Sequence, residues 1–479
     1  MNVDTMPLHP LITPEKLETV TVEDTSFYEP KFEALQPLLA NAAELQQAIA
    51  NLPLKERLEA IRLLGEAWQE NLERGRLEAL KRELHEATGY SPQLLELEME
   101  FVTEVLNPEN IIKLLDHTLI GGSRSLEEPV EVSKGEYLRN LPAGPALIIG
   151  SGNSLIPPLI PTTISLVIGN FTILRPSIAN FKAVREVYRP LQDLHGDNPL
   201  RQALAVSYFA HESRNLKALL EKAPLGIINY WGGEPGRTAV SRLLLSNPHR
   251  PRLIVNGPMT GFAIIDSANA TTETAEKLAL ETVLYDQQLC SSPTQAAFVG
   301  SKSEAIDFAE KLAASLDKTG RQHPLKLESL PYPLFIMRRS LELAGAKVYG
   351  STDPSNPWTV VLSEGQSTLQ KLPANTIIPF YARKRFLEII VVPTIKEALD
   401  LVVALPRNPA YAGVDRVQTL SLAVTGENLK QILSNIHRIG VYRAVPLGES
   451  YLRTPSEPYD GVSLPQAFSY TAYIRVRSG

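Results

Sequence analysis

Short apolar runs alternate with amphipathic, helix-length runs through the middle of the chain, and no other feature constrains the fold as strongly. The apolar runs have the length of strands, and the runs between them carry the three- and four-residue spacing of helices. The predicted strands are 146–149, 171–174, 203–209 and 226–230, and the predicted helices are 158–168, 180–191, 216–221 and 238–245. Such a regular β-α succession is typical of a parallel, doubly wound sheet. We therefore predict an α/β protein.

A second α/β block follows the first. Its predicted strands are 263–266, 297–299, 387–392 and 420–424, and its predicted helices are 272–284, 303–316 and 395–405, with an irregular stretch before residue 387. Upstream of both blocks, residues 32–119 have helical spacing, whereas residues 1–30 are rich in proline and are predicted to be irregular. Segments 130–138 and 470–476 alternate apolar and polar residues like exposed strands. A chain of 479 residues is long enough for two or three domains.

Composition excludes several classes of function. The formal net charge of −6 gives no electrostatic basis for a nucleic-acid partner, and the eight histidines lack metal-ligand spacing, so we predict no metal site. The chain opens without a signal-peptide pattern, and its most membrane-like stretch, 147–174, holds prolines and asparagines that a lipid-facing helix tolerates poorly. A single cysteine excludes an intrachain disulfide, as expected in a reducing cytosol. We therefore expect a cytoplasmic protein.

Cys290 is the only cysteine, and it follows the predicted helix 272–284 on a loop that leads into the predicted strand 297–299. Its neighbours are glutamine, serine and proline, which are unusual surroundings for a core cysteine. Most free cysteines are small buried hydrophobic residues, and that interpretation stays open from position alone. A sole thiol on a polar loop nevertheless makes Cys290 a candidate nucleophile.

Polar residues and glycines follow three of the predicted strands of the first block. Asn153 lies in a Gly-rich turn after 146–149, Arg175 follows 171–174, and Trp231, Gly232 and Gly233 follow 226–230. Ligands bind at the carboxyl ends of strands in open α/β sheets, so these residues are candidates for a binding site. The alternative is that an asparagine among glycines serves only the turn. The glycine spacing differs by one position from the dinucleotide-binding pattern.

Taken in this order, the segments resemble the aldehyde dehydrogenase superfamily from about residue 30 to residue 479. Residues 169–177, GNFTILRPS, are similar to its GNTVVLKPS strand; residues 286–290, DQQLC, are similar to its nucleophile loop; and residues 386–390, FLEII, are similar to its EIF segment. Within the superfamily, DQQLCSSP and the turn WGGE look most like the LuxC-type long-chain acyl-CoA reductases. These are the reductase components of bacterial bioluminescence fatty-acid reductase complexes.

The resemblance implies a Rossmann-type cofactor domain, an α/β catalytic domain and a small oligomerisation arm. The arm would combine the strand near 128–141 with a C-terminal strand at 469–477, and their unpaired edges would favour a homo-oligomer. The implied divisions are 1–127, the N-terminal helical part of the cofactor domain; 128–141, the oligomerisation hairpin strand; 142–254, the nicotinamide-binding domain; 255–440, the catalytic domain; and 441–479, the C-terminal segment.

The resemblance also implies a reaction, the reduction of a fatty acyl-CoA or acyl-carrier thioester to the aldehyde. Cys290 would attack the carbonyl and form an acyl-enzyme, and Asn153 would hydrogen-bond the oxyanion. The superfamily's general-base glutamate corresponds to Val255 here. Valine cannot activate water, so the acyl-enzyme should survive until it is reduced.

The resemblance also implies a nicotinamide cofactor, which would contact Arg175, Ser177, Ile178, Trp231, Gly232, Gly233 and Glu388. Glu388 matches the glutamate that holds the nicotinamide ribose, although Arg175 and Ile390 replace a lysine and an aromatic residue of the superfamily pattern. NAD-preferring members carry a glutamate three residues after that lysine, where this chain has Ile178. Without a carboxylate to repel a 2′-phosphate, and with the Arg175 fork and the Ser177 hydroxyl nearby, we predict NADPH, with NADH as the alternative.

Other readings stay open at this point. The alternative enzymes are an acyl-phosphate reductase of the γ-glutamyl phosphate type and a non-acylating aldehyde dehydrogenase, and the alternative class is a non-catalytic scaffold. Besides the acyl thioester, the expected partner is an acyl-transferring or acyl-activating enzyme. His211–Glu212 and the basic cluster Arg383–Arg385 are predicted to be solvated loops, and Tyr459–Gly461 a turn. The alternatives are contact of the basic cluster with a carrier phosphate and a substrate-channel role for Tyr459–Gly461.

Overall fold

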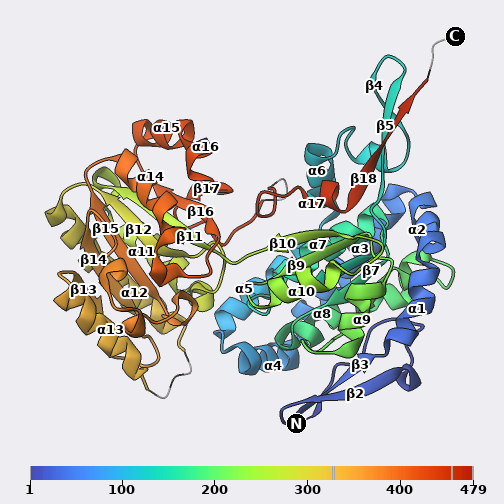
Figure 1. Cartoon of the computed structure of the whole chain (residues 1–479), viewed down its shortest axis with the longest axis horizontal. Coiled ribbons are helices and arrows are strands. Elements are labelled where there is room, and N and C mark those ends of the chain that lie inside the picture. Colours follow the sequence, from blue (N-terminus) through green and yellow to red (C-terminus); the bar gives the residue numbers. More distant parts are fainter. Residues whose placement is uncertain (1, 326, 328, 455–456, 477–479) are drawn as a thin grey trace. The chain divides into compact units, whose positions relative to one another are not determined.

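The computed structural model describes residues 2–325, 327, 329–454 and 457–476. The chain divides into two compact units (Figure 1). Unit 1 comprises Met1–Thr88, Glu96–Asn256 and Thr454–Gly479, and unit 2 comprises Gly89–Leu95 and Gly257–Arg453. Each unit is built around its own sheet of mainly parallel strands, as the β-α succession in the sequence predicts.

Unit 1 contains a five-stranded parallel sheet in the order β10-β9-β6-β7-β8. Its strands are β6 (Ala146–Ile149), β7 (Thr172–Arg175), β8 (Leu204–Val206), β9 (Ile227–Trp231) and β10 (Arg252–Asn256), and the helices between them are α7 (Ile156–Ile168), α8 (Phe181–Tyr188), α9 (Arg214–Lys222) and α10 (Gly236–Leu244). The chain runs from β6 outward to β8 and then returns to place β9 on the other side of β6. Ile149 pairs with both Arg175 and Tyr230, so the strands flanking β6 end beside it. The sheet therefore has a topological switch point between β6 and β9.

Helix α7 is buried along almost its whole length, which explains the apolar stretch that resembles a membrane span. One neighbour is the sheet of unit 1, through β6 and β7, and another is the N-terminal helix α3 (Leu54–Glu73). The interpretation of 147–174 as a strand, a loop and a core helix is thus confirmed. Within the described residues, no helix has both the length and the apolarity to cross a membrane.

The N-terminal region of unit 1 differs from the prediction. The prediction that residues 1–30 are irregular is wrong for part of this segment, because β1 (Asn2–Val3), β2 (Leu17–Val22) and β3 (Thr25–Pro30) form a three-stranded sheet. Leu8 also exchanges two backbone hydrogen bonds with Val206, at the outer edge of β8. The helical prediction for residues 32–119 is confirmed by α1 (Phe32–Ala40), α2 (Ala42–Asn51), α3, α4 (Glu78–Thr88), α5 (Pro92–Val105) and α6 (Pro108–Thr118).

A three-stranded antiparallel arm projects from unit 1 (Figure 1). It is made of β4 (Val130–Ser133), β5 (Glu136–Pro142) and β18 (Ser469–Arg475), in the order β18-β5-β4. Segment 130–138, predicted as an exposed hairpin strand, contains β4, the first part of β5 and the turn between them at Gly135, whose φ of 74° favours glycine. The pairing of the C-terminal strand with this region runs from Ser469 to Arg475. Residues 477–479, within the predicted C-terminal segment, lie outside the described residues.

Unit 2 contains a seven-stranded sheet in the order β13-β14-β15-β12-β11-β16-β17, in which only β13 is antiparallel to its neighbour. The strands are β11 (Met259–Asp266), β12 (Pro293–Val299), β13 (Lys347–Gly350), β14 (Thr359–Glu364), β15 (Phe386–Val392), β16 (Arg416–Ala423) and β17 (Arg443–Pro446). The helices are α11 (Thr272–Val283), α12 (Lys302–Gln322), α13 (Tyr332–Leu343), α14 (Ile395–Ala404), α15 (Gly426–Ser434) and α16 (Ile436–Ile439). The stretch before residue 387 is thus not irregular, since it holds α13, β13 and β14.

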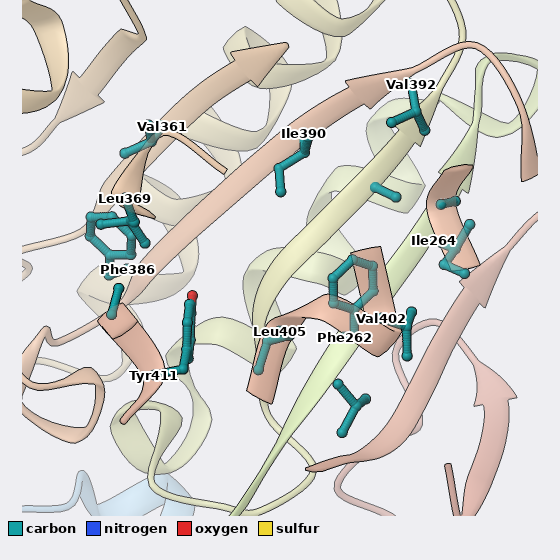
Figure 2. Close-up of a cluster of buried hydrophobic side chains, with 14 of the residues drawn as sticks. Phe262, Ile264, Val361, Leu369, Phe386, Ile390, Val392, Val402, Leu405 and Tyr411 are labelled. Atoms are coloured by element: carbon teal, nitrogen blue, oxygen red, sulfur yellow. The ribbon is translucent and has the colours of Figure 1, made fainter. Parts of the chain in front are cut away.

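Alternate residues of the central unit 2 strands β11, β12, β14 and β15 enter two different cores, because successive side chains of a strand point to opposite faces. Phe262 and Ile264 of β11 pack on one face with Val361 and Ile390, as Figure 2 shows. Ala263 of β11 packs on the opposite face with residues of α11 and α12. Burial on both faces explains why these strands read as continuous apolar runs.

We predict that acid weakens unit 1 through His9. The His9 Nδ1 accepts the Leu11 N–H at 3.1 Å, and its Nε2 lies 3.2 Å from the Gln202 carbonyl oxygen. This side chain is 6% exposed, and burial lowers its pKa from 6.5 to about 4. Between these values the unfolded chain binds the proton more readily, so stability is complete above pH 6.5 and falls as the pH drops toward 4. Lowering the pH from 7 to 5 should cost about 2 kcal/mol through this residue.

Urea unfolding of the wild type and of His9→Gln at both pH values measures the contribution of His9 to the free energy of unfolding. The glutamine variant should show the smaller loss, whereas His195→Gln, at an exposed position, should behave like the wild type. Equal pH dependence in all three proteins would refute the assignment.

Candidate functional site

Asn153 lies at the carboxyl end of β6, in the Gly-rich turn that the sequence indicates. Ser151 Oγ donates to its Oδ1 at 2.7 Å, which orients the amide group. A Cβ on Gly150 would stand 3.0 Å from the Pro158 side chain, and one on Gly152 would stand 3.3 Å from Ser177. The glycines therefore let this turn approach both α7 and the loop after β7.

The amino end of α7, directly after Asn153, is capped by a carboxylate from α5. Glu98 is buried, and it accepts hydrogen bonds from Ser154 Oγ and, at 3.1 Å, from the Leu155 N–H. Asn180 Nδ2 donates to the Ser154 carbonyl at 2.7 Å. A carboxylate is favourable at a helix amino terminus, so these contacts fix the turn that carries Asn153.

The predicted cofactor residues after β7 differ in burial and in hydrogen bonding. Arg175 is buried, its Nε and Nη2 both donate to the Phe209 carbonyl at 3.0 and 2.9 Å, and its guanidinium lies 5.1 Å from the Tyr208 ring centroid. Burial lowers the pKa of Arg175. The Ser177 hydroxyl is buried with no hydrogen-bond partner among the described residues, while Ile178 is 38% exposed. Part of the Arg175 fork is thus used by the backbone of unit 1, and its phosphate role stays a prediction.

The turn after β9 folds against Tyr230. The Tyr230 hydroxyl donates to the Gly233 carbonyl at 3.1 Å, and a Cβ on Gly232 or Gly236 would stand 2.8 or 2.2 Å from that hydroxyl. A side chain at either position would therefore force the Tyr230 ring to move. Trp231 is buried, and its Nε1 donates to Asn229 Oδ1 at 2.6 Å.

The C-terminal segment of unit 1 completes this edge of the sheet. The Tyr459 ring lies 4.8 Å from that of Trp231, and Asp460 accepts a hydrogen bond from Asn256 Nδ2 at 2.8 Å. Reciprocal backbone hydrogen bonds between Tyr459 and Val462 confirm the predicted turn. The segments after β6, β7 and β9 thus share the carboxyl edge at the switch point, where dinucleotides bind in sheets of this topology.

Cys290 lies, partly buried, on the loop between α11 and β12, which confirms the predicted helix-to-strand loop. The loop reaches the amino edge of the unit 2 sheet. There the Gly261 N–H donates to the Ser292 carbonyl at 2.8 Å. A Cβ on Gly261 would stand 2.1 Å from the Ser291 carbonyl oxygen, so only glycine allows this close approach of β11.

The prediction that Arg383–Arg385 is a solvated loop is wrong. Both arginines are buried, and Arg383 donates through Nε to the Ile378 carbonyl at 2.9 Å. Basic residues are usually exposed, and no local pattern in the sequence distinguishes these two. His211 and Glu212, by contrast, are exposed as predicted.

Glu388 of β15 is fully buried and is held by groups of unit 2. Its carboxylate accepts hydrogen bonds from Gln295 Nε2 at 2.7 Å, Ser363 Oγ at 2.8 Å, Ser367 Oγ at 2.6 Å and the Thr368 N–H at 2.6 Å. These donors join β12, β14 and the following loop to β15. A role of Glu388 toward a ribose therefore stays a prediction, and its observed contacts are internal.

Solved structures define the fold. Aldehyde dehydrogenase 21 from Physcomitrella patens superposes with a TM-score of 0.73 at 12% identity, covering 99% of this chain and 98% of that chain. Methylmalonate-semialdehyde dehydrogenase from Oceanimonas doudoroffii superposes with a TM-score of 0.70 at 14% identity, covering 100% and 99%. The fold is that of the aldehyde dehydrogenases, which confirms the predicted fold class.

The comparison of sequences identifies the family within this fold class. The family model described as acyl-CoA reductase (LuxC) matches residues 49–470, so the chain belongs to that family. The long-chain acyl-protein thioester reductases of Vibrio harveyi and Photorhabdus luminescens are each 25% identical to it over 303 and 308 residues. Each alignment covers 63% of this chain and 61% of the relative, so the chain spans about three fifths of the length of these relatives.

We predict that Gly261→Ala displaces the Cys290 loop. The new methyl group meets backbone rather than a movable side chain, and overpacking of this kind costs about 1–3 kcal/mol. The variant should unfold at lower urea concentration, and the rate at which iodoacetamide alkylates the sole cysteine should change. Gly426→Ala is the matched control, because a Cβ there meets nothing within 4 Å. Identical alkylation rates in all three proteins would show that the close approach does not set the loop.

Proposed function

We propose that the protein reduces a long-chain acyl thioester to the fatty aldehyde through an acyl-Cys290 intermediate, with NADPH as the reductant. The observation that carries the proposal is the placement of the only thiol of the chain on a partly accessible loop in a fold of this family. The names of the sequence relatives support the substrate class.

The first chemical step is thioester exchange. The Cys290 thiolate attacks the acyl carbonyl, a new C–S bond forms, and the bond to the carrier thiol breaks, so that the carrier leaves as a thiolate. The Cys290 backbone N–H and the Asn153 amide are the proposed donors to the oxyanion, and the hydrogen bond from Ser151 Oγ to Asn153 Oδ1 orients that amide. Because one thioester replaces another, this step needs no strong general acid.

The second step is reduction of the acyl-enzyme. A reduced nicotinamide, when bound, supplies a hydride to the acyl carbon. Collapse of the resulting thiohemiacetal then breaks the C–S bond, and the thiolate of Cys290 and the aldehyde are released. Hydrolysis would compete only if a base activated water. Val255 on β10 offers no such base, so aldehyde rather than free acid should be the product.

We predict that Cys290→Ala abolishes aldehyde formation, because no other thiol exists in the chain. The measurement uses long-chain acyl-CoA and acyl-protein thioesters, with NADPH oxidation followed by absorbance and the aldehyde identified directly. An acyl phosphate serves as the comparison substrate. Acyl labelling should be lost together with turnover, while tryptophan fluorescence and the melting temperature stay as in the wild type. An alanine variant that still turned over would rule out the acyl-Cys290 route.

The residues at the carboxyl edge of unit 1 fit a dinucleotide phosphate. The buried Ser177 hydroxyl has no hydrogen-bond partner among the described residues and can donate to a phosphate oxygen, and Ile178 presents no carboxylate beside it. A 2′-phosphate needs donors and is repelled by a nearby carboxylate, whereas the ribose hydroxyls of NADH favour one. The proposed preference is therefore for NADPH.

Substitution at Ile178 tests this preference. Ile178→Glu should lower the ratio of kcat/KM for NADPH to that for NADH by about tenfold or more, through one like-charge contact near the surface. Ile178→Gln has nearly the same size without the charge and should keep most of the wild-type ratio. A wild type that prefers NADH, or equal effects of both substitutions, would contradict the proposal.

We further propose that the arm formed by β4, β5 and β18 joins copies of the chain. Apolar side chains are exposed on it at Val132, Tyr470, Tyr473, Ile474 and Val476. Its outer strands also present free edges in the described structure, and such edges favour pairing. Light scattering should give a mass of at least two chains, and Tyr473→Lys should lower it. A monomeric wild type would refute this role.

A further inference from the structure

A buried ion pair lies at the base of the Cys290 loop. Arg385 is 1% exposed, and its Nε and Nη2 each lie 3.0 Å from Asp286 Oδ1. Its Nη1 donates to Asn356 Oδ1 at 2.8 Å, and its Nη2 donates to the His323 carbonyl. All three guanidinium nitrogens are therefore engaged within unit 2, and the residue is too deeply buried to meet a substrate.

The two chain segments that this pair joins have unusual backbone conformations. Among the described residues, eight non-glycine residues have positive φ, and five of them are Tyr285, Asp286, Gln287, Lys384 and Arg385. Non-glycine residues persist in this conformation only where the surroundings impose it, and such positions cluster at functional sites. Here segments 285–287 and 384–385 impose the conformation on one another, because the Asp286–Arg385 pair joins them.

Gln287 adds a second link between the same segments. Its Nε2 donates to the Phe386 carbonyl at 2.7 Å and to the Pro293 carbonyl at 2.9 Å, and its Oε1 accepts the Phe386 N–H at 2.6 Å. One side chain thus ties both ends of the Cys290 loop to the start of β15. Gln288 Nε2 donates to the Tyr381 carbonyl at 2.9 Å, which extends the attachment toward Cys290.

We infer that Arg385 is a positioning residue for Cys290. Its guanidinium holds Asp286, four residues before the thiol, in a left-handed conformation, and so fixes where the loop presents the Cys290 thiol and backbone N–H. This role rests on the proposed function only in taking Cys290 as the nucleophile. The anchoring itself is a property of unit 2 that can be measured without any substrate.

Arginine is required for this arrangement because its acceptors lie in three directions. A lysine has a single nitrogen, which cannot reach Asp286, Asn356 and the His323 carbonyl together. Arg385→Lys therefore keeps the charge but loses the fork. Asp286→Asn keeps the shape of the side chain and an acceptor oxygen but removes the negative charge that pairs with Arg385. It provides a second variant should the first fold poorly.

Arg338 offers a matched control in the same unit. It is 8% exposed, and its three nitrogens donate to Thr359 Oγ1 at 2.9 Å, the Ser351 carbonyl at 2.8 Å and the Trp358 carbonyl at 2.8 Å. It is a buried, fully engaged arginine, and its three hydrogen bonds go to residues 351–359 and not to the Cys290 loop. Its nearest connection to Arg385 is indirect, because the Thr359 N–H donates to the Arg385 carbonyl at 3.0 Å. Arg338→Lys therefore measures the general effect of losing such a fork from unit 2.

The experiment combines hydrogen exchange with steady-state kinetics on the full-length protein. In Arg385→Lys and Asp286→Asn, exchange of the amides in 284–292 should accelerate by about tenfold or more, as local opening becomes easier. The kcat for acyl thioester reduction should fall by up to about 10²-fold, the effect of a small misplacement of a reacting group, with little change in KM for the nicotinamide. Arg338→Lys should lower the melting temperature but leave both the 284–292 exchange and kcat near wild type.

The inference is overturned if exchange in 284–292 is unchanged, if it rises equally throughout unit 2, or if Arg338→Lys reduces kcat as much as Arg385→Lys. Failure of the proposed function appears separately, as turnover that survives in Cys290→Ala. In that case the exchange data still decide whether Arg385 anchors the loop.

Discussion

Buried carboxylates impose the strongest demand on this structure, because a carboxylate removed from water is tolerated only where several donors surround it. Glu98 caps α7, and Glu29 accepts the Ala210 N–H at 3.1 Å and a hydrogen bond from Ser213, the N-cap of α9. In unit 2, Glu281 accepts the Gly448 and Ser450 N–H groups at 2.8 and 2.9 Å. Asp286 and Glu388 complete the set. Most of these carboxylates accept hydrogen bonds from backbone N–H groups at the start of a helix or in a loop. In doing so they join segments that are far apart in the sequence.

This pattern explains how flexible connections become fixed ones. A loop has few internal hydrogen bonds, so its geometry depends on partners from elsewhere. The turn carrying Asn153 leads directly into the helix that Glu98 caps, and the loop carrying Cys290 begins at the Asp286–Arg385 pair. In each unit, a polar side chain buried in the scaffold holds the segment that bears a candidate functional residue.

Local signals made part of this structure predictable. Strands buried on both faces, such as β6 and β15, appear as continuous apolar runs, and the positions of Asn153 and Cys290 follow from where those strands and the helix α11 begin or end. The sequence also carried a usable signal for β14, whose Thr-Val-Val-Leu favours a strand, although the stretch was predicted irregular. The sheet at residues 2–30 was hidden by prolines and by side chains that are mostly no more than partly buried. The roles of Glu98 and Arg385 had no local signal, because their partners lie 56 and 99 residues away.

The contact of Leu8 with β8 has a consequence for how the protein behaves in concentrated solution. β8 is the last strand of its sheet, and an uncovered last strand is a template on which another molecule can add its own strand. The two hydrogen bonds between Leu8 and Val206 cover the outer edge of β8 with the N-terminal segment. The buried neutral ring of His9 holds that segment in place. Removing the first dozen residues, or protonating that ring, would therefore favour edge-to-edge aggregation of otherwise folded molecules, and turbidity would appear before secondary structure is lost.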